Sequence, residues 1–156
     1  MIQVSCFQHS LARFIPSSQN AIFLVIMTLF EQALRVREHA YAPYSSFKVG
    51  AALRSVSGKV YFGCNVENSA YPEGTCAEAG AIASMIADGE NEISEICIVA
   101  DSPNPISPCG GCRQKLAEFC QPSVPVHLAN LDGILESHSM AELLPNSFSS
   151  DHLPNE

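Results

Sequence analysis

Positive charge is scarce in this chain of 156 residues and is almost missing from its second half. Eight Lys and Arg stand against sixteen Asp and Glu, and from residue 60 onward only Arg113 and Lys115 face fourteen acidic residues. Proteins bind nucleic acids and anionic membranes mainly through clustered positive charge. With a formal net charge of −8, we expect no nucleic-acid partner and no membrane partner.

A hydrophobic run long enough to cross a bilayer is also missing. The apolar run at residues 21–30 (AIFLVIMTLF) has about half the length that a spanning helix needs. No small-residue cleavage site follows it, and the chain has no Asn-x-Ser/Thr glycosylation site. Seven cysteines are an odd number, which does not favour a disulfide framework. We therefore expect a cytoplasmic protein with reduced cysteines.

The apolar pattern predicts one α/β domain. Predicted helices cover residues 27–39, 75–87, 109–120 and 140–144, and predicted strands cover 47–54, 59–67, 94–100, 125–130 and 134–139. We expect a three-layer α/β/α sandwich around a mixed sheet of about five strands. Turns at 55–58 and 131–133 predict that the first two strands and the last two strands are antiparallel pairs.

Three cysteines stand where predicted helices begin. Cys109 and Cys112 lie one turn apart on one helix face, and Cys76 opens the earlier helix. A Cys-x-x-Cys pair alone is compatible with a redox dithiol or with half of a structural zinc knuckle. The third cysteine disfavours the dithiol, and a knuckle lacks its fourth ligand because His127 and His138 do not have the required spacing. Three thiolates and one open position are typical of catalytic zinc.

Glu78 has two candidate roles in this pattern. Residues 75–78 (TCAE) match a capping box, in which the glutamate binds the backbone N–H of the helix cap. The same carboxylate follows a candidate zinc ligand by two residues, where it can transfer protons during hydrolysis. Because both parts of a zinc motif are present, we interpret Glu78 as the catalytic acid and base.

The two-part pattern, residues 76–78 (CAE) followed by 108–112 (PCGGC), resembles the signature of the zinc nucleobase deaminases. Three further stretches resemble the small cytidine deaminases that act on free nucleosides: 41–53 (YAPYSSFKVGAAL), 65–71 (NVENSAY) and 142–148 (ELLPNSF). The resemblance implies the three-layer fold and one Zn²⁺ per chain. It also implies hydrolytic deamination of cytidine and 2′-deoxycytidine to the uridine nucleosides and ammonia, in pyrimidine salvage.

The resemblance also assigns roles to single residues. It makes the three cysteines the zinc ligands and Glu78 the proton shuttle. It makes Asn65 and Glu67 the partners of a ribose hydroxyl and Phe47 a contact of the pyrimidine ring. Phe148 corresponds to an aromatic residue that enters the site of a neighbouring subunit, which implies a homotetramer with shared sites.

Two features depart from the family pattern. Ala79 stands directly after the catalytic glutamate, where the family often has an arginine that offsets the charge of the thiolates. We expect Arg113, next to Cys112, and the positive ends of two helices to compensate that charge. The first 26 residues have no counterpart. We therefore expect residues 1–26 to be a dispensable extension and residues 27–156 to form a single cytidine deaminase domain.

Other readings remain open at the level of sequence. A deaminase of an aminopyrimidine nucleoside antibiotic would share nearly all of these motifs. Deamination of cytosine within nucleic acid would use the same core, but it requires a basic channel for the backbone. The other four cysteines lie in apolar or helical settings and are interpreted as inert thiols: Cys6, Cys64, Cys97 and Cys120.

Overall fold

A five-stranded mixed sheet with the strand order β2-β1-β3-β4-β5 forms the centre of the molecule in a computed structural model that describes residues 27–154. Its strands are β1 (Val49–Ser55), β2 (Val60–Cys64), β3 (Ile93–Ala100), β4 (Pro125–Ala129) and β5 (Ile134–Ser139). β3 and β4 are parallel, and all other neighbours are antiparallel. The predicted extension at residues 1–26, including Cys6, lies outside the described residues.

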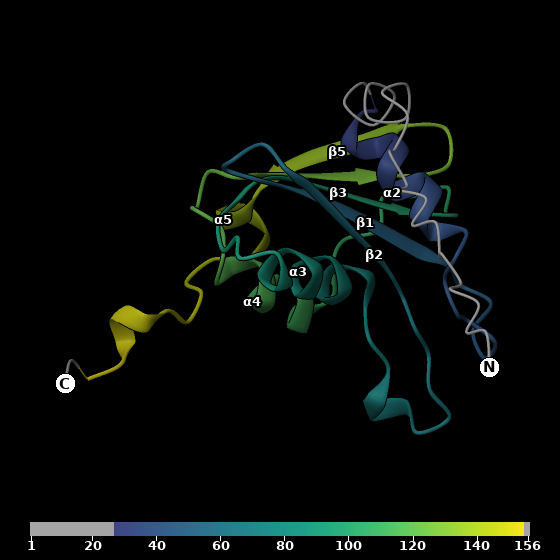
Figure 1. The fold of residues 1–156 in the computed structure, drawn as a ribbon, viewed down its shortest axis with the longest axis horizontal. Helices are drawn as coiled ribbons and strands as arrows, with labels where there is room; N and C mark the ends of the chain where they lie inside the picture. The colour runs from purple at the N-terminus through teal and green to yellow at the C-terminus, as the bar shows by residue number, and fades with distance from the viewer. Residues whose placement is uncertain (1–26, 155–156) are drawn as a thin grey trace, which may run out of the picture.

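Helices cover both faces of this sheet (Figure 1). Helix α2 (Leu29–Arg37) lies on one face, against β1, β2 and β3. Helices α3 (Ala77–Ala87), α4 (Gly110–Ala117) and α5 (Met140–Leu143) lie on the other face. Each face has its own core: Ala33 of α2 packs with Ala52 and Cys97 of the sheet, and larger side chains such as Met85 and Leu116 fill the other side. The predicted three-layer sandwich is confirmed.

The two predicted turns are confirmed by their backbone geometry. Gly58 has a φ of 91° and donates to the carbonyl of Ser55 at 2.9 Å, which closes the β1–β2 hairpin. In the second turn, the side-chain oxygen of Asn130 accepts from the N–H groups of Asp132 at 2.9 Å and Gly133 at 3.1 Å. An Asn side chain that binds the backbone in this way stabilises a tight turn.

Helix α3 lies in direct backbone contact with β2. A Cβ atom at Gly63 would stand 2.5 Å from both the carbonyl oxygen of Ala77 and the nitrogen of Ala81. Only glycine allows this approach, because any side chain would push α3 away from the sheet. The contact therefore sets the height of the first turn of α3, where Cys76 and Glu78 lie.

The strand predicted at residues 59–67 ends earlier, at Cys64. Beyond it the chain leaves the sheet, because Val66 forms isolated bridges to Tyr41 and Thr75 instead of pairing with β1. This connection runs through a short 3-10 helix, η1 (Tyr71–Glu73), to the start of α3. Asn65 and Glu67 consequently lie in a loop beside the start of α3. No helix in the described part of the chain is long and apolar enough to span a membrane.

Candidate active site

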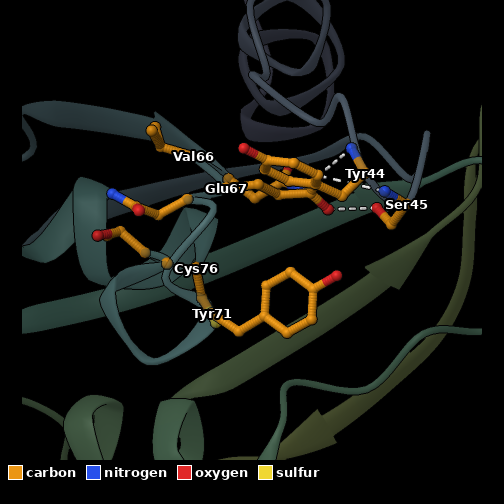
Figure 2. A pocket seen from close by; sticks show the side chains of 10 residues that line it. Tyr44, Ser45, Val66, Glu67, Tyr71 and Cys76 are labelled. Atoms are coloured by element: carbon orange, nitrogen blue, oxygen red, sulfur yellow. Dashed lines mark hydrogen bonds between the residues drawn. The ribbon is translucent and has the colours of Figure 1, made fainter.

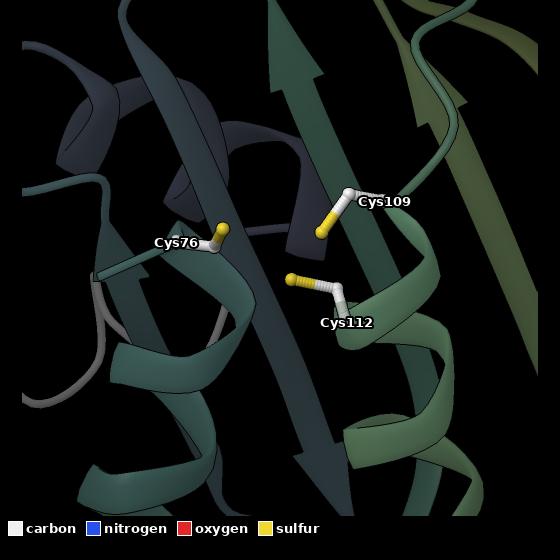
Figure 3. A group of neighbouring side chains, drawn as sticks. All are labelled: Cys76, Cys109 and Cys112. Atoms are coloured by element: carbon white, nitrogen blue, oxygen red, sulfur yellow. The ribbon is translucent and has the colours of Figure 1, made fainter. Parts of the chain in front are cut away.

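The three predicted cysteine ligands come together at two helix starts. Cys76 is the N-cap of α3, Cys109 is the N-cap of α4, and Cys112 lies in the first turn of α4. Their side chains point toward one another (Figure 3), and their sulfur atoms all lie within 4.8 Å of one another. Among residues 27–154, this is the one group of three or more His, Cys, Asp or Glu side chains placed to hold a metal ion.

This cluster fits zinc in geometry and in charge. Two sulfur ligands on a tetrahedral zinc ion stand about 3.8 Å apart, so small side-chain adjustments suffice to bind the ion. A hydrogen bond from the backbone N–H of Cys112 holds the pKa of the Cys109 thiol below its usual value. Burial raises the pKa of the Cys76 and Cys112 thiols. The positive ends of two helices favour the thiolates that a zinc ion requires.

Glu78 faces this cluster from inside the protein. Because Cys76 caps α3, Glu78 is the second residue of the helix and makes no capping box. Its side chain is 5 % exposed, and its carboxylate accepts a hydrogen bond from the Cys112 thiol at 3.3 Å. The capping-box alternative is therefore wrong. A buried carboxylate beside the candidate ligands can take up and release protons there.

Two neighbouring cavities adjoin at Asn65 and Cys76. The smaller cavity, of about 220 Å³, contains Glu78 and the three cysteines, and Ile98 and Ile106 form part of its apolar wall. The larger one, of about 460 Å³, lies beside the loop between β2 and α3 (Figure 2). Asn65 and Cys76 line both cavities. A flat ring in the small cavity and a polar group in the large one can therefore belong to one ligand.

A family model described as "Cytidine and deoxycytidylate deaminase zinc-binding region" matches residues 26–128. A cytidine deaminase of Sporosarcina psychrophila is 48% identical over 125 residues, which cover 80% of this chain and 92% of that protein. The chain belongs to the cytidine and deoxycytidylate deaminase family. A cytidine deaminase of Halalkalibacterium halodurans is 41% identical, with 80% of this chain and 95% of that protein covered.

Solved structures of the family share this fold. The crystal structure of a cytidine deaminase from Burkholderia pseudomallei superposes with a TM-score of 0.74 at 46% sequence identity. The match covers 78% of this chain and all of that chain. The matched family model is described as a zinc-binding region, and the sulfur cluster observed here can hold such an ion.

The residues expected to bind ribose are both engaged with one loop of the protein. The side chain of Asn65 accepts from the N–H of Val49 at 2.8 Å and donates to the carbonyl of Phe47 at 2.9 Å. The Glu67 carboxylate accepts from the backbone N–H groups of Tyr44 and Ser45 at 2.8 and 3.2 Å. Both residues line the large cavity, so they hold the 44–49 segment at its edge.

Phe47 is less embedded than the family resemblance implies. Its side chain is 38 % exposed, and it is not among the residues that line either cavity. Two tyrosines that the sequence reasoning missed, Tyr44 and Tyr71, line the large cavity instead. Their rings meet edge to face at 6.1 Å and are largely exposed. Both lie in stretches that resemble the family, residues 41–53 and 65–71, and this position could have marked them as candidate site residues.

Arg113 hydrogen-bonds to two segments near the candidate zinc ligands, the loop before α4 and the end of α5. Its guanidinium donates to the carbonyls of Pro108 at 2.8 Å and Leu143 at 2.9 Å, and to the hydroxyl of Ser107 at 2.8 Å. These bonds tie the loop before Cys109 to the end of α5. Its predicted role in charge compensation stays a prediction, since its hydrogen bonds in the described structure go to oxygen atoms.

Phe148 lies away from both cavities of its own chain. Its side chain is 58 % exposed and stacks on His152, with ring centroids 5.4 Å apart. The backbone carbonyl of Phe148 accepts from the side chain of Gln114 at 2.9 Å, which ties this segment to α4. The C-terminal segment extends away from the sheet (Figure 1).

The remaining candidates lie outside the cluster. His127 contacts Ser137 at 2.7 Å and Glu95 at 3.3 Å on the sheet. Burial raises the pKa of Cys97 and Cys120 to about 12, which agrees with their interpretation as inert thiols.

Proposed function

We propose that this chain catalyses the hydrolytic deamination of cytidine and 2′-deoxycytidine to uridine and 2′-deoxyuridine, with release of ammonia. The observation that carries the proposal is the buried carboxylate of Glu78 beside the sulfur cluster, in the wall of a small cavity. The relatives named cytidine deaminase, at up to 48% identity, support a cytosine nucleoside as the substrate. None of the relatives reported above is named for deamination of an antibiotic nucleoside or of a nucleic acid, so these alternative substrates are not favoured.

Zinc held by Cys76, Cys109 and Cys112 would act as a Lewis acid and lower the pKa of water, which supplies a nucleophile near neutral pH. Glu78 takes up a proton from the attacking water and passes it to N3 of the base. The same carboxylate then takes the remaining proton from the hydroxyl group added at C4 and delivers it to the amino group, which leaves as ammonia. Burial of Glu78 keeps bulk water from competing for these protons.

The two cavities divide the recognition of the nucleoside. We place the pyrimidine in the small cavity, whose apolar wall includes Val49 and Ile98. We place the ribose in the large cavity, where a hydroxyl group meets Asn65 and Glu67. Phe47 is proposed to contact the pyrimidine ring.

We also infer a homotetramer with shared sites. The support is the exposure of Phe148, which lies outside both cavities of its own chain and is available to a neighbouring subunit.

We also propose a location in the cytoplasm, because the three thiol ligands must stay reduced. There, the reaction would serve pyrimidine salvage.

Ammonia release tests the proposed function directly. The purified chain is loaded with zinc and given cytidine, 2′-deoxycytidine, an aminopyrimidine nucleoside antibiotic and a cytosine-containing oligonucleotide in parallel. We expect turnover of the first two substrates and one zinc ion per chain by metal analysis. Turnover of the antibiotic alone, or of the oligonucleotide alone, would replace the proposal with the corresponding alternative.

A further inference from the structure

Ser45 makes two of the three hydrogen bonds that tie the loop at the large cavity to the Glu67 carboxylate (Figure 2). Its hydroxyl donates to the Glu67 carboxylate, and its backbone N–H donates to the same carboxylate at 3.2 Å. The hydroxyl also accepts from the backbone N–H of Phe47 at 3.0 Å. One small side chain therefore contacts both a candidate ribose partner and a candidate base contact.

The backbone next to Ser45 needs this support. Ser46 has a φ of 58°, a left-handed conformation that a residue with a side chain rarely adopts. The bond from Phe47 N–H to the Ser45 hydroxyl spans this residue and stabilises the tight turn. At its other end, the carbonyl of Phe47 is held by the Asn65 side chain. The orientation of Phe47 thus depends on bonds at both of its backbone polar groups.

The same bonds fix the Glu67 carboxylate. Glu67 is only partly buried, so without these bonds its carboxylate would rotate and present several orientations to a ligand. Hydrogen bonds from the Ser45 hydroxyl and from the Tyr44 and Ser45 backbone hold the pKa of Glu67 below its usual value. An oriented, ionised carboxylate is a better acceptor for a sugar hydroxyl than a mobile one, because less entropy is lost on binding.

We propose that Ser45 is a positioning residue that couples the ribose partner Glu67 to the turn that carries Phe47. This inference deepens the proposed function and rests on it. Because Ser45 acts on binding groups and not on Glu78, its loss weakens nucleoside binding more than turnover. The hydroxyl is the part that matters, so threonine at this position preserves the effect.

The chain offers a matched control in Ser57. Its hydroxyl lies in the β1–β2 turn and also donates to a partly buried carboxylate, that of Glu90 at 2.8 Å, outside both cavities. The variants are Ser45→Ala, Ser45→Thr and Ser57→Ala in the zinc-loaded full chain. Each is compared for KM and kcat with cytidine and for zinc content. Ser45→Ala is also combined with Glu67→Gln.

We expect Ser45→Ala to raise KM about tenfold while kcat changes less than about twofold, the effect of one lost hydrogen bond to a charged group. Zinc content stays unchanged, Ser45→Thr restores KM, and Ser57→Ala behaves as the wild type. In the Glu67→Gln background, the Ser45→Ala effect shrinks to less than about threefold, because the coupled partner is already altered. An unchanged KM, or the same loss in both backgrounds, overturns the coupling.

A readout without turnover separates this inference from the proposed function. Exchange of the Phe47 amide hydrogen reports its bond to Ser45 directly. We expect protection to fall in Ser45→Ala and to persist in Ser45→Thr. If the wild type releases no ammonia from cytidine, the proposed function fails, and the exchange measurement still decides on Ser45. Equal protection of Phe47 in all variants overturns its role.

Discussion

Glu78 stands one position closer to the helix start than a capping glutamate requires. A capping box needs the glutamate three residues after the cap, and Cys76 rather than Thr75 is the cap of α3. The carboxylate is consequently free of the backbone and accepts from the Cys112 thiol. A shift of one residue at the helix start thus determines whether the Glu78 carboxylate binds the backbone of the helix cap or contacts the cysteine cluster.

Replacing Glu78 with glutamine tests this assignment. We expect Glu78→Gln to lower kcat by about 10²- to 10⁴-fold, the usual contribution of a general acid and base. Zinc content and the affinity for uridine, the product, are expected to stay close to the wild type, because glutamine keeps the shape of the side chain.

Steady-state kinetics, metal analysis and calorimetry measure these three quantities. Glu118→Gln, an exposed glutamate next to the end of α4, serves as the control. Turnover of Glu78→Gln near the wild-type rate would remove Glu78 from the reaction.

At the scale of elements, the sulfur cluster depends on how two helices rest on one sheet. Cys76 is the N-cap of α3, and the other two candidate ligands are the N-cap of α4 and a residue of its first turn. The relative height of the two helices is set partly by the backbone contact between Gly63 in β2 and the first turns of α3. A displacement of α3 therefore moves one candidate zinc ligand relative to the other two.

Gly63→Ala tests this dependence. The added Cβ overlaps the carbonyl oxygen of Ala77, so we expect the unfolding free energy to fall by about 1–3 kcal/mol. Zinc affinity falls as well, because Cys76 is displaced from Cys109 and Cys112. Urea denaturation and competition with a zinc chelator measure the two effects.

Gly110→Ala is the matched control, since a Cβ there meets no atom within 4 Å. We expect it to retain both stability and zinc affinity. Normal zinc affinity in a folded Gly63→Ala protein would contradict the link between the β2–α3 contact and the metal site.

At the scale of the whole molecule, the first helix of the described domain, α2, has a complete N-terminal cap. Thr28 caps α2 by accepting from the N–H of Glu31 at 3.2 Å, and the Glu31 carboxylate accepts from the N–H of Thr28 at 2.7 Å. This complete capping box lies within the described residues. The family match begins at residue 26, next to it.

A chain that starts at Met27 therefore keeps every hydrogen bond of the α2 cap. We propose that residues 27–156 form a single cytidine deaminase domain, and we expect this shortened chain to match the full chain in Tm, zinc content and kcat. Thermal unfolding, metal analysis and the ammonia assay compare the two proteins. Aggregation of the shortened chain, or loss of its metal, would assign a structural role to residues 1–26.

Shared sites predict complementation between two inactive chains. Glu78→Ala and Phe148→Ala chains are unfolded, mixed in equal amounts and refolded together with zinc. If Phe148 completes a neighbour's pocket, about a quarter of the pockets receive Glu78 from one chain and Phe148 from another, and activity returns. No return of activity in verified mixed oligomers would refute the shared site.

The order and type of the elements followed from the sequence alone. Apolar periodicity, turn residues and cap residues act over a few neighbouring positions, which explains why the helices, the strands and both turns were predicted. The pairing of Cys109 and Cys112 in the sulfur cluster was also predictable, because a helix start presents these two positions on one face whatever surrounds it. The end of β2 at Cys64 was not, since Val66 pairs with Tyr41 and Thr75 instead of continuing the ladder.

Only the tertiary structure decided how the candidate nucleoside contacts are held. The Glu67 carboxylate accepts from the backbone N–H groups of Tyr44 and Ser45, which lie 23 and 22 positions earlier in the chain. Asn65 binds the backbone of the same loop. Such bonds depend on how two loops meet after folding, and no local pattern encodes that meeting. The start of α3 also became visible only in the folded protein. There α3 begins at Ala77, whose carbonyl packs against Gly63 of β2, and this start leaves Glu78 outside a capping box.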